Sequence, residues 1–467
     1  MRLIALSLLT LLALPHPAQA TPDFEKLNSA LTDSFVIPGY AKLAAKTTAL
    51  SGVTKRHCAA PTPASLQDVK RGFADAMTAW QEIAIISFGP ITENARAARV
   101  QFWPDKRGTA ARQIRRVLLK KEKSLLAPGG LTGKSVALQN LTTFERLLTS
   151  APDAPFPCGL MAAIAAFQAD QARATLEDWR KPGGFRQSVV TAKQGNRHFT
   201  AATGPATAFL KSIATLLDIV IRYKLETPLG DSIGNAAPKS AETWRTGLSR
   251  RNIAANLDAI AALFTIPGGF TDRMAEQNSR ALAEAIVRLL GDAAGRTREL
   301  NLPLSEAVTD ADERKKVQEI LRNLQDIRIL IRESVVNTLN LCLTGAGFRP
   351  ANAADDAQQA YISCGADRSG NFLAAAFDGT GRIVFSIPLP ERGHDIVVHP
   401  GGNTAIIVAR RPGTSFSVLD LRDGRQVRRI ATRADRHLYG HGAFSPDGTR
   451  FYTTENDFDS GIGAIGV

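Results

Sequence analysis

The stretch Val69-Lys-Arg-Gly-Phe73-Ala-Asp-Ala-Met77-Thr-Ala-Trp80 decides the fold class of most of this chain. Its large apolar residues recur at spacings of three and four, which places them on one face of an α-helix. The same spacing continues from about residue 24 to residue 345, where alternation of β-branched residues is nearly absent. The sequence therefore predicts a mainly α fold, built as helical bundles, over this range.

Clusters of proline and glycine separate the predicted helices. The most pronounced is Pro152-Asp-Ala-Pro-Phe-Pro157. Because proline cannot continue a helix, we expect this segment to divide the helical domain, residues 21–348, into two lobes. The lobes would cover about 21–151 and 158–348, which are ordinary sizes for helical bundles.

The first twenty residues have the features of a secretory signal peptide. A short basic start, Met1-Arg2, precedes an apolar run from Leu3 to Leu14, and Ala18-Gln19-Ala20 supplies small residues for cleavage. No later apolar run is long enough to predict a transmembrane span in the mature chain. We therefore expect an exported protein, located in the periplasm if the host is Gram-negative.

The chain has four cysteines, and export permits disulfides. Four cysteines allow three pairings. Cys58 and Cys158 flank one helical region in loop-like settings, so we favour a disulfide between them. Cys342 with Cys364 would join a helix end to the following segment, and this pairing stays open.

The net charge of the 467-residue chain is +13, from lysines and arginines scattered over the predicted helices. This pattern is typical of a solvated basic surface. An exported protein has little access to chromosomal DNA, so we expect no nucleic-acid partner; weak attraction to an acidic envelope surface is the more plausible effect.

The character of the sequence changes after Gly345. A small polar linker, residues 349–359, leads into short strand-like runs over 360–467. Asp-Gly and Pro-Gly-Gly turns separate these runs, and their spacing is typical of β-propeller blades. Only about two blades fit, so we expect a partial, incomplete propeller.

Several motifs in the helical region resemble the imelysin family of bacterial envelope proteins. They are Trp-Gln-Glu-Ile, Ser-Phe-Gly-Pro-Ile and Arg-Val-Gln-Phe-Trp-Pro-Asp within 80–105, the segment 139–148, Thr227-Pro-Leu-Gly230, Ala241-Glu-Thr-Trp-Arg245 and Arg251-Asn-Ile253. The resemblance covers nearly all of residues 22–348. It implies two packed helical lobes with a pocket between them, export, and in many members a link to iron acquisition.

The family was first filed as metallopeptidases, and its signature is Gly-x-His-x-x-Glu on a helix. Aligned on Glu145, this chain has Asn140 at the glycine position and Thr142 at the histidine position. A neutral threonine hydroxyl is a poor substitute for imidazole on a transition metal. Peptidase activity is therefore disfavoured, and of this pair only Glu145 could still bind a metal.

The resemblance suggests a ligand pocket, although each group also has a structural interpretation. Gln139, Thr142 and Glu145 form a polar row at i, i+3 and i+6, which is either a pocket wall or a solvated or interhelical row. Trp103 and Asp105 either end one helix and cap the next or join Arg99 in the pocket. Glu242, Trp244 and Arg245 either line the pocket or pack the second lobe, with Arg245 paired to a carboxylate.

Residues 360–467 resemble the beginning of a second family, of uncharacterised bacterial proteins predicted to be β-propellers. Arg392-Gly-His394, Arg410-Arg-Pro-Gly413 and Arg436-His-Leu-Tyr-Gly-His-Gly442 are among the motifs that match. His394, His437 and His441 are candidate metal ligands, with His399 nearby. Histidines beside glycines at strand ends also commonly hydrogen-bond the backbone in turns.

The sequence leads to one preferred function and two alternatives. The preferred function is a periplasmic, non-peptidase binding or accessory protein linked to iron handling. Its partners would be a small ligand or metal and other envelope proteins of iron handling. Iron or another divalent metal is the candidate cofactor. The alternatives are a metal-dependent hydrolase or peptidase and an envelope interaction scaffold.

Overall fold

In a computed structural model, the chain forms two compact units, Met1–Leu341 and Cys342–Val467. The structure describes residues 23–105, 107–193, 196–339, 341, 361–366, 371–377, 383–410, 412–445, 447–457 and 462–467. The predicted signal peptide, the predicted linker and Cys342 lie outside the described residues.

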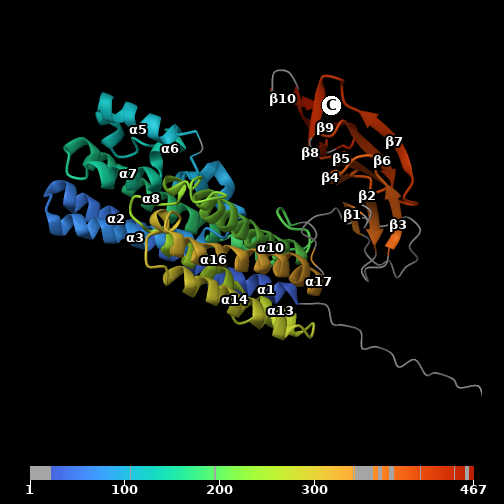
Figure 1. Cartoon of the computed structure of the whole chain (residues 1–467), viewed down its shortest axis with the longest axis horizontal. Coiled ribbons are helices and arrows are strands. Elements are labelled where there is room, and N and C mark those ends of the chain that lie inside the picture. The colour runs from blue at the N-terminus through green and yellow to red at the C-terminus, as the bar shows by residue number, and fades with distance from the viewer. Residues whose placement is uncertain are drawn as a thin grey trace, which may run out of the picture. The chain divides into compact units, whose positions relative to one another are not determined.

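The first unit is helical, as predicted (Figure 1). Its helices are α1 (Phe24–Leu31), α2 (Ile37–Ala59), α3 (Pro63–Ile83), α4 (Arg96–Val100), α5 (Thr109–Lys120), α6 (Val136–Gln139), α7 (Leu141–Ser150), α8 (Pro155–Arg180), α9 (Phe185–Val190), α10 (Thr203–Asp218), α11 (Thr227–Leu229), α12 (Ser249–Thr265), α13 (Phe270–Ala275), α14 (Arg280–Arg298), α15 (Leu304–Ala307), α16 (Ala311–Ile329) and α17 (Val336–Thr338). Six shorter or wider helical segments join them: η1 (Thr32–Val36), η2 (Gly89–Ala95), η3 (Lys123–Leu126), η4 (Ile219–Glu226), η5 (Pro238–Ser240) and η6 (Leu330–Val335).

Helix α3 shows how local sequence and packing agree. Thr62 and Ser65 form a capping box at its start, and Pro63 occupies the first turn, where a missing N–H costs nothing. The predicted apolar face is buried, and Phe73 stacks on Phe144 of α7 with ring centroids 5.6 Å apart. This face therefore joins α3 to the rest of the core.

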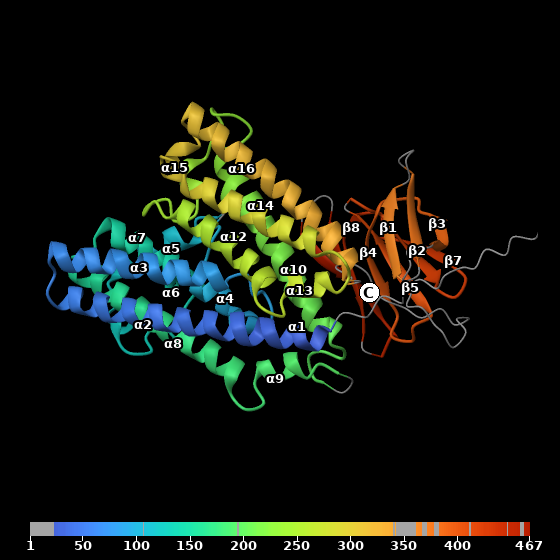
Figure 2. The ribbon, with the colours of Figure 1, turned by 90° about the horizontal axis from the view of Figure 1, so that it is seen from below.

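The proline-rich segment at 152–157 starts a helix rather than separating two packing groups. Pro155 and Pro157 lie in the first turn of α8, and α8 packs along the length of α2 (Figure 2). A disulfide joins Cys58 at the end of α2 to Cys158 at the start of α8, the pair favoured from the sequence. The bundle begun by α2 and α3 therefore continues past residue 158.

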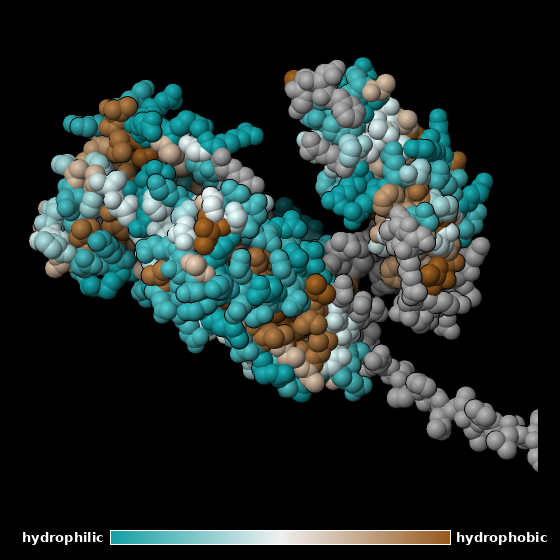
Figure 3. Space-filling model, viewed as in Figure 1, coloured by the Kyte–Doolittle hydropathy of each residue, from teal (hydrophilic) through white to brown (hydrophobic). Residues whose placement is uncertain are grey.

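The second group of helices contains α10, α12, α14 and α16. The stretch Thr203–Leu229 is long and apolar enough to cross a membrane, but 61% of its apolar window is buried inside the protein. Burial of this kind is typical of a core helix. Figure 3 shows one face of the helical unit as mostly hydrophilic, with hydrophobic residues in small patches.

The Phe-Gly-Pro motif has a packing role in this fold. The Phe88 ring contacts those of Trp179, Phe185, Phe199 and Phe209, with the Phe209 centroid 5.0 Å away. Gly89 has a φ of +72°, and a Cβ there would lie 2.8 Å from the Phe185 ring. Glycine is therefore required by both conformation and space.

In the described part of the second unit, the strands pair antiparallel and form three sheets. Their strands are β1 (Tyr361–Ala366), β2 (Phe372–Phe377), β3 (Ile383–Pro388), β4 (Gly393–Val398), β5 (Thr404–Ala409), β6 (Ser415–Asp420), β7 (Gln426–Ala431), β8 (Arg436–Phe444), β9 (Phe451–Asp457) and β10 (Gly463–Gly466). The sheet orders are β1-β2-β3, β4-β5-β6-β7 and β10-β9-β8, so the described strands form three sheets where the sequence suggested two blades. These strands do not close into a ring.

Strand β5 supplies the centre of this unit. Its residues 405–409 are all buried, as expected of a continuous apolar run. Ala405 and Ile407 pack with residues of the first sheet, whereas Ile406 and Val408 pack with Leu438 of the third. The middle sheet is therefore covered on both faces.

Candidate functional site

The predicted row of Gln139, Thr142 and Glu145 does not lie on one helix, so this part of the prediction is wrong. Asn140 is extended (φ −106°, ψ 167°), and its side-chain oxygen accepts a hydrogen bond from the Thr143 N–H at 3.0 Å. Asparagine is a favoured N-cap because it satisfies an otherwise unpaired helix donor. The chain therefore ends α6 at Gln139 and starts α7 at Leu141.

Gln139 and Arg99 are structural residues. The buried Gln139 amide donates to the Lys134 carbonyl at 3.0 Å and accepts from Arg99 Nη1 at 2.7 Å. Arg99 Nε also donates to the Asn94 carbonyl, at 2.8 Å. These bonds hold loop backbone in place, and neither residue lines the cavity described next.

Six residues considered for the pocket do line one cavity of about 560 Å³ in the helical unit. They are Trp103, Asp105, Thr142, Glu145, Trp244 and Arg245. They come from the loop before α5, from α7 and from the segment before α12. The cavity has the size of a small-molecule site. Its other charged or aromatic side chains are Arg146, Tyr223 and Lys239.

Glu145 is a buried carboxyl group in the wall of this cavity. Its Oε1 accepts hydrogen bonds from the Thr246 backbone N–H at 3.0 Å and the Thr246 hydroxyl at 2.8 Å. Burial raises the pKa of Glu145 above its ordinary value, even though these two bonds and Arg245 oppose the rise. The group is therefore protonated more readily than an exposed glutamate.

Thr142 lies one turn before Glu145 and lines the same cavity. Its hydroxyl oxygen is buried and has no hydrogen-bond partner. A buried polar atom without a partner costs free energy, because the hydrogen bonds it made to water are lost. A ligand in the cavity could supply the missing hydrogen bond.

The donor set does not fit a transition metal. A metal site needs several ligands, and the two carboxylates of the cavity are already engaged, Glu145 by Thr246 and Asp105 by backbone N–H groups at the start of α5. The Thr142 hydroxyl is neutral and a poor metal ligand. The side chains of Arg146, Lys239 and Arg245 line the same space and would repel a cation. Within the described residues, no group of three or more histidine, cysteine or acidic side chains is arranged to hold a metal, so Glu145 is not part of such a site.

Cationic and aromatic groups form one side of the cavity. The Arg245 guanidinium lies 4.3 Å from the centroid of the Trp244 ring, and Lys239 Nζ lies 5.8 Å from it. Burial lowers the pKa of Arg245, the nearby Arg146 lowers it further, and Glu145 raises it. Two arginines and a lysine therefore lie around one indole ring and one buried carboxyl group.

Asp105 has the capping role considered in the sequence. Its two carboxylate oxygens accept from the Thr109 and Ala110 N–H groups at 2.8 and 2.9 Å, at the start of α5. These bonds leave the carboxylate stabilised by helix donors. Asp105 shapes the cavity wall, and Trp103 beside it contributes apolar surface.

Glu242 lies in a buried network rather than in the cavity. Lys224 Nζ donates to Glu242 Oε2, Gln81 Oε1 and Asn256 Oδ1, each at 2.7 Å, so all three ammonium protons have acceptors. Burial lowers the pKa of Lys224, and Glu242 opposes that effect. Since the network joins α3, η4 and α12, its role is to fix their packing.

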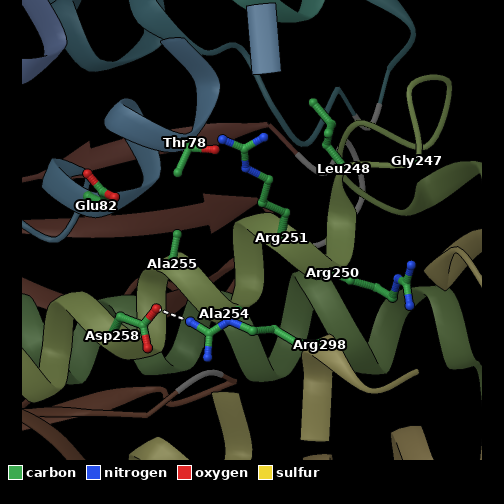
Figure 4. Close-up of a pocket in the computed structure, with 10 residues that line it drawn as sticks. All are labelled: Thr78, Glu82, Gly247, Leu248, Arg250, Arg251, Ala254, Ala255, Asp258 and Arg298. Atoms are coloured by element: carbon green, nitrogen blue, oxygen red, sulfur yellow. Dashed lines mark hydrogen bonds and ion pairs between the residues drawn. The ribbon is translucent and has the colours of Figure 1, made fainter. Parts of the chain in front are cut away.

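A second cavity, of about 480 Å³, lies between α3, α12 and α14 (Figure 4). Most of its charged groups are already paired: Arg251 with Asp75, Arg298 with Asp258, and Glu82 with Lys42. The arginine side chains drawn in Figure 4 point in different directions instead of converging. This cavity is therefore a weaker candidate for a ligand site.

The predicted metal ligands in the β unit do not assemble into a metal site. The rings of His394 and His441 lie 4.9 Å apart by centroid, whereas His437 stacks beside Tyr439. His399 hydrogen-bonds backbone at Gly401 and Gly448, which is the turn role considered for these residues. A metal cluster of His394, His437 and His441 is absent from the described residues.

Sequence reasoning missed four residues around the cavity: Arg146, Tyr223, Lys239 and Thr246. Arg146 directly follows Glu145, and Thr246 directly follows the motif ending at Arg245. Adjacency to those motifs was the available signal. Tyr223 lies four residues before the motif that starts at Thr227, and Lys239 lies two residues before the motif that starts at Ala241. Tertiary packing brings both of them to the cavity.

A family profile described as imelysin matches residues 36–331, and one described as protein of unknown function (DUF1513) matches residues 387–467. No match was found among curated proteins.

Two solved structures share the helical fold. An imelysin-like protein from Psychrobacter arcticum 273-4 aligns with a TM-score of 0.59 at 20% identity, over 69% of this chain and 99% of its own. A chain from Parabacteroides distasonis ATCC 8503, named as an iron-regulated protein A precursor, aligns with a TM-score of 0.57 at 14% identity, over 68% of this chain and 97% of its own. At these identities the likeness concerns the fold.

Proposed function

This chain belongs to the imelysin family, and we propose that it is an exported, non-peptidase binding protein whose helical cavity holds a small organic anion. The observation that carries the proposal is the set of side chains in that cavity. Arg146, Lys239 and Arg245 line the same cavity as a carboxyl group that burial makes easy to protonate, and the Thr142 hydroxyl has no partner.

The same set of side chains argues against a metallopeptidase. Metal-dependent hydrolysis requires a metal held by several ligands with one position open for water. In this chain Thr142 occupies the position of the family histidine. The cationic side chains in the same cavity disfavour a metal ion. An anionic ligand, in contrast, would offset the repulsion between Arg146 and Arg245.

The proposed ligand class is a polycarboxylate able to carry iron. Guanidinium groups bind carboxylates through paired hydrogen bonds, and the indole of Trp244 offers a flat apolar surface beside them. The link to iron rests on the family resemblance and on the name of the Parabacteroides distasonis neighbour. Export rests on the predicted leader and agrees with the disulfide between Cys58 and Cys158.

Calorimetric titration of the chain lacking its leader, with citrate and with ferric citrate, tests this function. We expect at least one of the two to bind, and Arg245→Gln and Lys239→Gln each to weaken binding by about tenfold, since each removes a charge-assisted hydrogen bond. Arg115→Gln is the matched control, because Arg115 is exposed on α5 outside the cavity. It should change affinity by less than about twofold.

Two outcomes would overturn the proposal. Absence of binding by both compounds would remove the proposed ligand class. Equal weakening by Arg115→Gln and Arg245→Gln would mean that net charge, rather than the cavity, attracts the anion.

A further inference from the structure

Glycines lie at the contacts between strand β4 of the middle sheet and strands β1 and β8 of the other two sheets. Strand β4 contacts both β1 and β8. A Cβ on Gly393 would lie 2.4 Å from Cys364 Sγ, and one on Gly440 would lie 2.4 Å from the His394 ring. Gly440 also has a φ of +99°, which few other residues adopt. The side chains of Cys364 and His394 therefore occupy the space that a Cβ atom on Gly393 or Gly440 would need.

A β-bulge sets the direction of the His394 side chain. Gly393 pairs with Ala409 and Asp395 pairs with Val408, so His394 is the extra residue on β4. A bulge of this kind interrupts the alternation of side chains along a strand and redirects the extra one. Here the ring lies against Gly440 and beside His441.

His394 shares a cavity of about 400 Å³ with two arginines, Arg392 and Arg410. The Arg410 N–H donates to the Arg392 carbonyl oxygen at 2.7 Å, which places the residue directly before β4 beside the residue directly after β5. Phe372 and Cys364 complete the wall. Asp395, the acidic residue next to His394, lies 3.7 Å from His441.

The electrostatic surroundings of this cavity are positive. Burial lowers the pKa of His394 below its ordinary value, and the charges of His441, Arg410 and Arg392 lower it further, while Asp395 opposes them. The Cys364 thiol stays neutral, because burial and Asp395 raise its pKa to about 12. Among the described residues, the cavity wall therefore contains two arginines and a histidine, with the carboxylate of Asp395 next to it in the chain.

We propose that the cavity of Arg392, His394 and Arg410 is a binding site for a small oxyanion, such as a phosphate or carboxylate group. The two guanidinium groups supply paired N–H donors of the geometry that oxyanions accept. The imidazole supplies another donor when it is protonated. A bound anion would also offset the repulsion among these three side chains. The site belongs to the β unit and is independent of the helical cavity.

Inorganic phosphate is the probe for this site. In the full chain lacking its leader, we expect phosphate to shift the titration midpoint of the His394 ring signal upward in an NMR pH titration, because a nearby anion favours imidazolium. His394→Asn identifies the signal by removing it. Sodium chloride at matched ionic strength controls for screening, and it should shift the midpoint less than phosphate does.

Substitutions locate the bound phosphate. Arg392→Gln and Arg410→Gln should each weaken phosphate binding by about tenfold and abolish most of the His394 shift. Arg428→Gln removes the same charge from an exposed position on β7 and should leave both unchanged. The site is overturned if phosphate moves the His394 midpoint no further than sodium chloride does. It is equally overturned if Arg428→Gln and Arg410→Gln have the same effect.

Discussion

Thr142 and Glu145 lie one turn apart on α7 and line the same cavity, yet they differ in what satisfies them. Glu145 accepts two hydrogen bonds from Thr246, whereas the buried Thr142 hydroxyl has no partner. In the family signature these two positions could hold a metal. Here one carries an acid with hydrogen-bond partners and the other a hydroxyl without one. Removal of the unsatisfied Thr142 hydroxyl should therefore increase the stability of the ligand-free protein.

Thr142→Val is therefore expected to stabilise the ligand-free protein. Valine has nearly the same shape and removes the buried hydroxyl, so the free energy of unfolding should rise by about 0.5–1.5 kcal/mol. Urea denaturation at neutral pH measures the change. Thr143→Val is the matched control: the Thr143 hydroxyl donates to the Ala137 carbonyl, and its loss should cost about 1 kcal/mol. A destabilised Thr142→Val protein would contradict the interpretation.

Comparison of the wild type with Glu145→Gln should reveal how the buried Glu145 carboxyl group makes stability depend on pH. Because the folded-state pKa of Glu145 is raised, the folded protein binds more protons than the unfolded chain as pH rises past the unfolded-state pKa. The wild type therefore loses stability over the window between the unfolded and folded pKa values. The glutamine variant keeps an acceptor for Thr246 and does not titrate.

The check on Glu145 is the difference in melting temperature between wild type and Glu145→Gln across mildly acidic to neutral pH. The variant should gain relative to wild type as pH rises and level off above the folded-state pKa. A difference that stays constant with pH, or that changes in the opposite direction, would show that the pKa of Glu145 is not raised in the folded protein.

Lys224→Met tests the buried network. Removing the ammonium group leaves Glu242 buried beside Gln81 and Asn256 without its cation, and breaking a buried ion pair in this way costs about 3–5 kcal/mol. Lys211→Met is the control, since Lys211 is exposed on α10 and should change stability by less than about 0.5 kcal/mol. Both are measured by urea denaturation. Similar losses in the two variants would mean that the network contributes little.

The helical class and the two-part organisation could be predicted because both follow from local pattern. The spacing of Val69, Phe73, Met77 and Trp80 places a continuous apolar face on α3, and those side chains are buried. The run 405–409 likewise predicts a strand that is buried on both faces. Periodicity of this kind depends on neighbours in the chain, which the sequence displays directly.

The site was predicted only in part, because side-chain direction depends on local breaks and on distant partners. Asn140 ends one helix and caps the next, which turns Gln139 away from the row it shares in sequence with Glu145. Glu242 pairs with Lys224, a residue that no motif near Glu242 indicates. Lys239 lines the cavity from the short segment η5. Such pairings appear only when the helices are packed.

The disulfide between Cys58 and Cys158 links stability to the compartment. It closes a loop of 100 residues between the end of α2 and the start of α8, and a cross-link over such a loop is expected to contribute about 4 kcal/mol by restricting the unfolded chain. Urea denaturation with and without dithiothreitol should show a loss of about that size. The double variant Cys58→Ser/Cys158→Ser should match the reduced wild type and be insensitive to dithiothreitol.

If reduction leaves the wild-type midpoint unchanged, the packing of α8 on α2 already restricts this loop and the cross-link adds nothing. A large loss would instead mean that the protein reaches full stability only in an oxidising compartment, as an exported protein does.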